Sequence, residues 1–198
     1  MTSVSPRETV TSEAVLDVAL TLFAERGYHG TALSQIAERL DVRTPSLYNH
    51  MRSKHDLLLT IVRRTVDGVL ADFRAATAGR TDPLDRLYHA TLVYARRHAT
   101  HRREAIVVNR DTSSLEEPYR SEMQARRREH EHALRDIISD GVATGRFAIA
   151  SPALGSFAIR EMCVSIARWF NDEGPITPDQ VAREYTEFAL NIVGVGRV

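Results

Sequence analysis

Basic and short polar side chains are concentrated between Arg39 and Lys54. This stretch holds four basic residues and one acidic residue, whereas the 198-residue chain carries 26 residues of each sign and no net charge. Hydroxyl, amide and imidazole groups lie among them, at Thr44, Ser46, Tyr48, Asn49 and His50. Such groups hydrogen-bond to the edges of bases, and basic side chains pair with phosphates. The stretch therefore has the chemistry of a nucleic-acid-binding surface.

Two short amphipathic helices are predicted to position these side chains. The first carries apolar residues on one face from Leu33 to Leu40, and we expect Thr31 to cap it. Only three residues separate it from a second helix, predicted from Thr44 to Met51. Together they make a helix-turn-helix, whose second helix fits the major groove of DNA. An ordinary pair of bundle helices is the alternative interpretation.

Helix signals continue along the whole chain. Residues that cap helices precede five of the seven prolines, at Ser5-Pro6, Thr44-Pro45, Asp82-Pro83, Ser151-Pro152 and Thr177-Pro178. With a further cap at Ser53, these signals predict helices over 6–26, 32–40, 44–51, 54–78, 83–99, 102–110, 117–144, 152–171 and 178–194. No convincing run of alternating polar and apolar residues predicts a strand. The expected fold is all-α, with about nine helices.

Catalytic and metal-binding patterns are not found. His98 and His101 share a helical face, but no cysteine partner or HExxH spacing accompanies them, and the chain has no phosphate-binding loop and no GxSxG motif. Cys163 is the only cysteine, so no disulfide can form within the chain. We therefore expect no enzyme, metal or cofactor. The absence of a signal-peptide pattern and of a long apolar run predicts a cytoplasmic protein outside the membrane.

The amino-terminal part resembles the DNA-binding head of TetR-family transcriptional regulators. The resemblance covers residues 10–60 and rests on Ala19-Leu-Thr-Leu-Phe-Ala-Glu-Arg-Gly-Tyr-His-Gly-Thr31, Ile36-Ala-Glu, Val42, Leu47-Tyr-Asn-His50 and Ser53-Lys54. It implies a helix-turn-helix domain over 6–53, a ligand-binding and dimerisation domain over 54–198, and a homodimer formed by the last two helices.

The same resemblance implies the residues that contact DNA. Thr31, Tyr48 and Lys54 would contact phosphates, and the segment from Arg43 to Asn49 would read bases. The expected surface thus comprises Thr31, Arg43, Thr44, Pro45, Ser46, Tyr48, Asn49, His50 and Lys54. Arg43 departs from the family pattern, which has a capping serine there, and we expect Thr44 to cap the recognition helix one residue later.

The carboxyl-terminal part is similar to TetR regulators that respond to fatty acyl-CoA or related thioesters. This similarity rests on Arg128 to Gly145, Trp169-Phe, Gly174-Pro-Ile-Thr-Pro178 and Glu184-Tyr185. Coenzyme A needs arginines for its phosphates and an aromatic ring for adenine, so the expected ligand residues are Arg160, Arg168 and Trp169. The expected apolar interior is Leu92, Ile106, Met123, Met162 and Phe170. The alternatives are a solvated arginine face and a tryptophan in the core.

The helix predicted over 152–171 is apolar on all sides. Such a helix must be covered on more than one face, and a second copy of the chain can cover one of them. We expect Gly155 and Ala158 to allow that close approach, although a central core helix is the alternative. The expected function is a dimeric repressor that leaves a palindromic operator when an acyl-CoA thioester binds. A helical small-molecule-binding protein, or a multidrug-responsive regulator with an uncharged apolar effector, is the alternative.

Overall fold

The computed structural model describes residues 10–195, which form nine α-helices and one short 3-10 helix without any strand. The predicted all-α fold is therefore confirmed. The helices are α1 (Ser12–Arg26), α2 (Leu33–Arg39), α3 (Thr44–Leu47), α4 (Lys54–Thr77), α5 (Pro83–Thr100), α6 (Arg102–Asp111), α7 (Tyr119–Ala143), α8 (Pro152–Trp169) and α9 (Pro178–Val193). The 3-10 helix η1 (Thr112–Ser114) follows α6. None of these helices is both long and apolar enough to cross a membrane.

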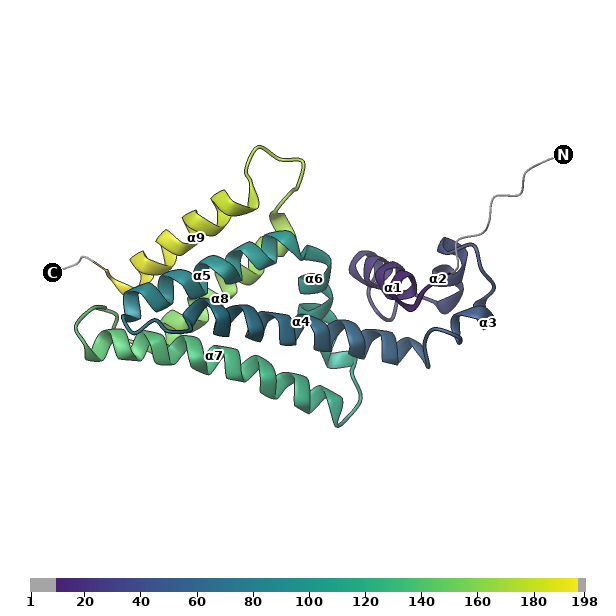
Figure 1. Ribbon diagram of the computed structural model, residues 1–198, viewed down its shortest axis with the longest axis horizontal. Coiled ribbons are helices and arrows are strands. Elements are labelled where there is room, and N and C mark those ends of the chain that lie inside the picture. The colour runs from purple at the N-terminus through teal and green to yellow at the C-terminus, as the bar shows by residue number, and fades with distance from the viewer. Residues whose placement is uncertain (1–9, 196–198) are drawn as a thin grey trace.

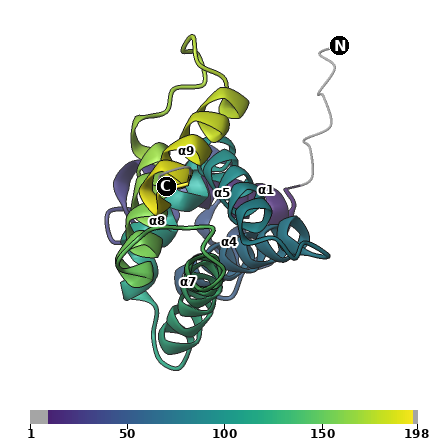
Figure 2. The same ribbon diagram turned by 90° about the vertical axis from the view of Figure 1, so that its left-hand side faces the viewer.

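The molecule has a small head and a longer helical body (Figure 1). The head consists of α1, α2 and α3, and α4 extends from it along the body. Helix α6 contacts α1 of the head as well as α4 and α8 of the body. Figure 2 views the body from the end opposite the head, with α8 and α9 on one side of α4, α5 and α7. A change inside the body can therefore reach the head through α4 or α6.

Most of the predicted helix starts are capped as expected. The side chains of Ser53, Asp82, Ser151 and Thr177 each accept a hydrogen bond from a backbone N–H in the first turn of the helix that follows. The first helix starts later than predicted. It begins at Ser12, after a cap in which Thr11 accepts from the Ala14 N–H, and the Ser5-Pro6 pair lies outside the described residues.

One hydrophobic core joins the head to the body. Phe23 and Leu47 of the head lie in the same buried cluster as Leu58 of α4, Val107 of α6 and Met123 of α7. Each of these five side chains is fully buried. Tightly packed interiors transmit displacements because they contain few voids that could absorb them. This shared core therefore couples the position of the head to the packing of α4, α6 and α7.

Candidate functional site

The recognition helix is shorter than the sequence predicts. Regular α-helix ends at Leu47, and the N–H groups of Tyr48, Asn49 and His50 then bond to carbonyls three residues earlier, as in a 3-10 turn. The predicted end at Met51 was therefore wrong. Met51 is buried below this turn, so the tighter winding still closes the head over its core.

The cap predicted at Thr44 is also wrong. Arg43 occupies the cap position with extended backbone, Thr44 is the first helical residue, and no side chain caps this helix. Pro45 then lies at the second helical position. The first N–H groups of any helix lack intrahelical partners, so a proline there removes no backbone hydrogen bond.

The structure brings most of the predicted DNA-binding residues to one surface of the head. Arg43, Pro45, Ser46, Tyr48 and Asn49 are exposed. Two more of the predicted residues, Thr44 and His50, are half-buried beside them. Leu47 is the buried residue in the middle of this segment and fixes it on the core. An exposed amide, hydroxyls and a guanidinium are thus presented on a helix that is anchored from below.

Thr31 and Lys54 are placed differently. Thr31 is only 1% exposed, and its hydroxyl donates to the carbonyls of Leu22 and Gly27. It therefore neither faces solvent nor caps α2, whose cap position is Ala32. The Lys54 ammonium donates to the Tyr28 and Thr31 carbonyls at 2.9 and 2.8 Å. It also lies 4.4 Å from the centre of the Tyr28 ring. Since an ammonium has three N–H groups, one donor remains for another partner.

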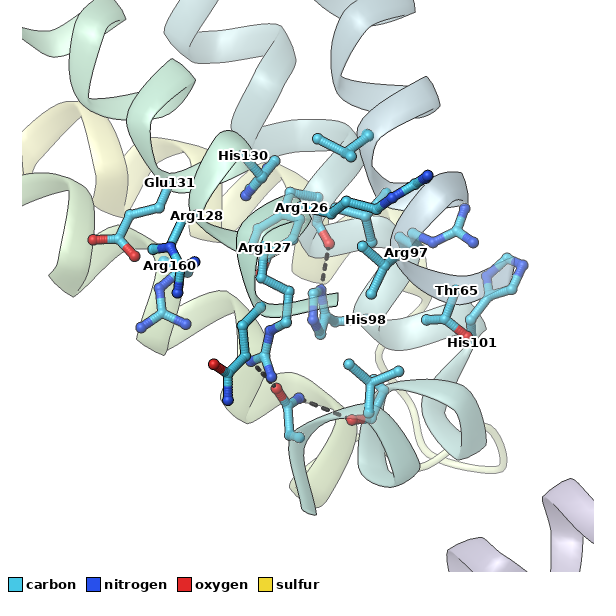
Figure 3. A pocket seen from close by; sticks show the side chains of 18 residues that line it. Thr65, Arg97, His98, His101, Arg126, Arg127, Arg128, His130, Glu131 and Arg160 are labelled. Atoms are coloured by element: carbon cyan, nitrogen blue, oxygen red, sulfur yellow. Dashed lines mark hydrogen bonds between the residues drawn. The ribbon is translucent and has the colours of Figure 1, made fainter. Parts of the chain in front are cut away.

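A cavity of about 250 Å³ lies in the body between α4, α5, α6, α7 and α8 (Figure 3). Its apolar lining comes from Val66, Val69, Leu70, Ala105 and Val108. The apolar interior predicted from the sequence was wrong, because none of Leu92, Ile106, Met123, Met162 and Phe170 lines this cavity. Met123 and Phe170 are buried in separate hydrophobic clusters instead.

One of the three predicted ligand residues lines the cavity. Arg160 does so, whereas Arg168 and Trp169 do not. These two residues lie more than two turns further along α8, about 12 Å away along its axis, and both are exposed. The Trp169 ring stacks on Tyr185 of α9, with 6.1 Å between the ring centres. The structure therefore separates these two residues from the cavity.

Arginines dominate the polar part of the lining. Arg97, Arg126 and Arg160 are paired with the carboxylates of Asp72, Asp67 and Glu161, and Arg128 is exposed. Arg127 differs from them. It donates to the Asn109 side chain at 3.0 Å, and no carboxylate pairs with it among the described residues. Burial lowers the pKa of this guanidinium. A half-buried cation that lacks a paired carboxylate favours an anionic partner, so the cavity is suited to an anionic ligand.

The cavity lining also contains Tyr94 and two buried histidines. His98 and His130 flank the Tyr94 ring, with ring-centre distances of 4.4 and 4.6 Å. Burial lowers the pKa of each histidine to about 4, so both rings are neutral at pH 7. From the sequence, the histidines were considered only as metal ligands, and neither His130 nor Arg127 was selected as an effector-binding residue. The part of the chain that the structure describes contains no group of three side chains able to hold a metal ion.

Helix α6 connects the cavity to the head. Ala105, Val108 and Asn109 of this helix line the cavity. Arg110, one residue further on, donates to the carbonyls of Phe23 and Ala24 at the end of α1. Arg103 pairs with Asp17 of α1 at 3.0 Å. A displacement of α6 by a bound ligand would therefore also displace α1 through these contacts.

Helices α8 and α9 expose several large apolar side chains. Leu154, Phe157 and Trp169 of α8 and Phe188 of α9 are each between 45% and 70% exposed. Ala158 is exposed among them. Gly155, predicted to lie in this surface, is buried instead, because the Ile149 side chain of the same chain packs against it. A Cβ added at Gly155 would lie 2.6 Å from that side chain. Its small size therefore serves the internal packing of α8.

Comparison with known proteins identifies both parts of the chain. Residues 15–61 match the family "Bacterial regulatory proteins, tetR family", and residues 80–193 match "Tetracyclin repressor-like, C-terminal domain". The transcriptional repressor KstR2 of Rhodococcus jostii is 29% identical over 182 residues, which cover 89% of this chain and 88% of that protein.

Solved structures show the same arrangement of helices. The ketosteroid transcriptional regulator KstR2 of Mycobacterium tuberculosis superposes with a TM-score of 0.86 at 25% identity, covering 96% of this chain and 95% of that one. AibR, solved with isovaleryl coenzyme A and operator DNA, gives 0.79 at 24% identity, covering 89% and 96%. These matches are to regulators of transcription and not to enzymes. The chain belongs to the TetR family of DNA-binding transcriptional regulators.

Proposed function

We propose that this regulator is a cytoplasmic homodimeric repressor, released from a palindromic operator by an acyl-CoA thioester. Residues 6–53 would form its DNA-binding domain, and residues 54–198 its ligand-binding and dimerisation domain. The observation that carries the proposal is Arg127, a half-buried guanidinium without a paired carboxylate, in a cavity whose α6 wall contacts the head. Such a cavity can hold an anionic ligand, and binding of that ligand can change the position of the recognition helix through α6.

The DNA-binding surface is proposed to be the exposed segment around α3. Ser46 and Asn49 present a hydroxyl and an amide that can hydrogen-bond to base edges, and an asparagine pairs well with adenine. Arg43, Tyr48 and the remaining Lys54 donor are suited to phosphates. Thr44, Pro45 and His50 lie within or beside the same segment. The buried Thr31 is proposed to have a structural role. Its hydroxyl donates to the Gly27 carbonyl, and its own carbonyl accepts a hydrogen bond from the Lys54 ammonium.

The dimer is proposed to form through α8 and α9. Exposed apolar patches of this kind mark protein interfaces, and a two-fold interface uses the same patch on both copies. Leu154, Phe157 and Phe188 would contact the partner copy, and Trp169 would cover the edge of the patch. Two heads related by a two-fold axis would bind half-sites in successive major grooves, which explains the palindromic operator.

The effector is proposed to place a phosphate of its coenzyme A near Arg127 and Arg160. Its acyl group would contact Val66, Val69, Leu70 and Val108. An uncharged apolar effector would fill the same space but would leave Arg127 without an anion. One similar protein supports this choice, since AibR was solved with isovaleryl coenzyme A.

Release from DNA would follow from linkage between the two sites. A ligand that contacts Ala105, Val108 and Asn109 favours one position of α6 over another. Arg110 and Arg103 link α6 to α1, because Arg110 donates to the Ala24 carbonyl and Arg103 pairs with Asp17. A shift of α6 would therefore also shift α1. The effector then binds best to an arrangement in which the two recognition helices no longer match successive grooves.

Removing the charge of Arg127 tests the effector proposal. Wild-type protein on DNA from upstream of its own gene should be released by micromolar acyl-CoA, which is about −8 kcal/mol of binding. Arg127→Gln should require roughly 10-fold more thioester, because a charge-assisted contact is lost, while its DNA affinity without ligand stays unchanged. Arg135→Gln, on the same helix but outside the cavity, is the matched control. Release by an uncharged apolar compound, with a panel of acyl-CoAs inactive, would contradict the proposal.

A further inference from the structure

The cavity contains a hydrogen-bonding group that a simple alkyl chain cannot use. His98 of α5 and His130 of α7 are only 6% and 5% exposed, and both line the cavity (Figure 3). Both rings contact Tyr94. A phenol and two imidazoles are thus gathered where an acyl group would lie. Buried polar groups in folded proteins are nearly always satisfied by a partner.

The orientation of His98 defines what its free nitrogen can do. Its Nδ1 lies 2.8 Å from the Tyr94 carbonyl oxygen. A carbonyl only accepts hydrogen bonds, so Nδ1 must carry the hydrogen and donate it. Burial lowers the pKa of His98 to about 4, so the ring is neutral at pH 7 and carries no second hydrogen. Its Nε2 is therefore a hydrogen-bond acceptor, and no donor reaches it among the described residues.

Tyr94 and His130 supply hydrogen-bond donors. Within residues 10–195, no hydrogen bond joins the Tyr94 hydroxyl or the His130 ring to another protein group. A phenol can donate its O–H, and a neutral imidazole always carries one N–H. The two rings contact each other at a centre distance of 4.6 Å. The cavity thus offers at least one donor next to the acceptor on His98.

We infer that the part of the effector that fills this cavity carries a hydroxyl group. Its O–H would donate to His98 Nε2, and its oxygen would accept from Tyr94 or His130. A carbonyl could only accept and would leave Nε2 without a donor, whereas an alkyl chain would satisfy neither side. The inference rests on the proposed acyl-CoA function and narrows it to hydroxyacyl thioesters.

A matched set of thioesters tests this inference on the full-length protein by isothermal titration calorimetry. The set is octanoyl-CoA, its isomers with one hydroxyl group at each position along the acyl chain, and the corresponding oxo compounds. At least one hydroxyoctanoyl-CoA should bind about 10-fold more tightly than octanoyl-CoA, because desolvated polar groups gain partners. The oxo compound of the same position should bind less tightly than the hydroxy compound.

Variants at His98 and at a control histidine test whether His98 causes the preference for the hydroxy compound. His98→Leu keeps a similar volume and removes the acceptor, and it should abolish the 10-fold preference for the hydroxy compound over octanoyl-CoA. His132→Leu, on the exposed face of α7, should keep the preference. Equal binding of all the thioesters, or a preference that survives in His98→Leu, overturns the hydroxyl site and leaves the acyl-CoA function standing. If no thioester binds while the protein still binds its upstream DNA, the acyl-CoA proposal itself fails and this inference fails with it.

Discussion

Phe188→Asp is expected to separate the dimer and to lower operator affinity on the order of 100-fold or more. Phe188 is 49% exposed on α9, and its ring centre lies 5.7 Å from that of Tyr185, which stacks on Trp169 of α8. In the proposed interface its replacement would bury two carboxylates, one from each copy, without partners. A separated monomer would bind only one half-site of the operator. Binding of two linked heads typically raises the affinity by a factor of about 10² to 10⁴, and this gain would be lost.

Light scattering and fluorescence anisotropy on operator DNA measure the two effects separately. Val142→Asp is the control, because Val142 is an apolar residue on α7 with 38% exposure and lies outside the α8 and α9 surface. The control should remain a dimer with wild-type affinity. If Phe188→Asp is a dimer with full operator affinity, the interface does not lie on this surface.

Acidification from pH 6.5 to pH 4 is expected to lower the free energy of unfolding by roughly 3 kcal/mol for each of His98 and His130. Burial lowers the pKa of both histidines to about 4, whereas an unfolded histidine titrates near 6.5. The unfolded chain therefore binds protons first as the pH falls. The stabilising effect of the neutral rings is complete above pH 6.5 and is lost as the pH approaches 4.

Urea unfolding at fixed protein concentration between pH 6.5 and 5 isolates these two groups. Carboxylates contribute mostly at lower pH, because arginine partners or hydrogen bonds hold the pKa of Glu13 and Glu117 below the usual value. The double variant His98→Leu with His130→Leu should lose most of the slope in this window, and His132→Leu should keep it. A double variant with the wild-type slope would show that other groups titrate there.

The fold was predictable because its signals are local. The caps at Ser53, Asp82, Ser151 and Thr177 and the apolar periodicity between them define helices without reference to the rest of the chain. The exposed face around Ser46 and Asn49 was predictable for the same reason, since Leu47 between them is the apolar residue of a short amphipathic helix. Helix ends were less predictable, as the early end of α3 shows.

The effector cavity was not predictable to the same extent, because its lining depends on how five helices pack. Arg127 and Arg128 are neighbours in the sequence, yet one is partly buried against Asn109 and the other is exposed. Arg168 and Trp169 have the right chemistry for coenzyme A but lie on the outer part of α8. Thr31 has a residue type that caps helices, but packing turns its hydroxyl inward.

Binding to DNA from immediately upstream of the gene tests the central claim most directly. We predict salt-dependent binding of a dimer that is much tighter on this DNA than on random DNA of equal length. Asn49→Ala should lose ~1–3 kcal/mol on the operator and little on random DNA, because a base contact is removed and phosphate contacts are kept. Equal affinity of the wild-type protein for both DNAs would contradict the account.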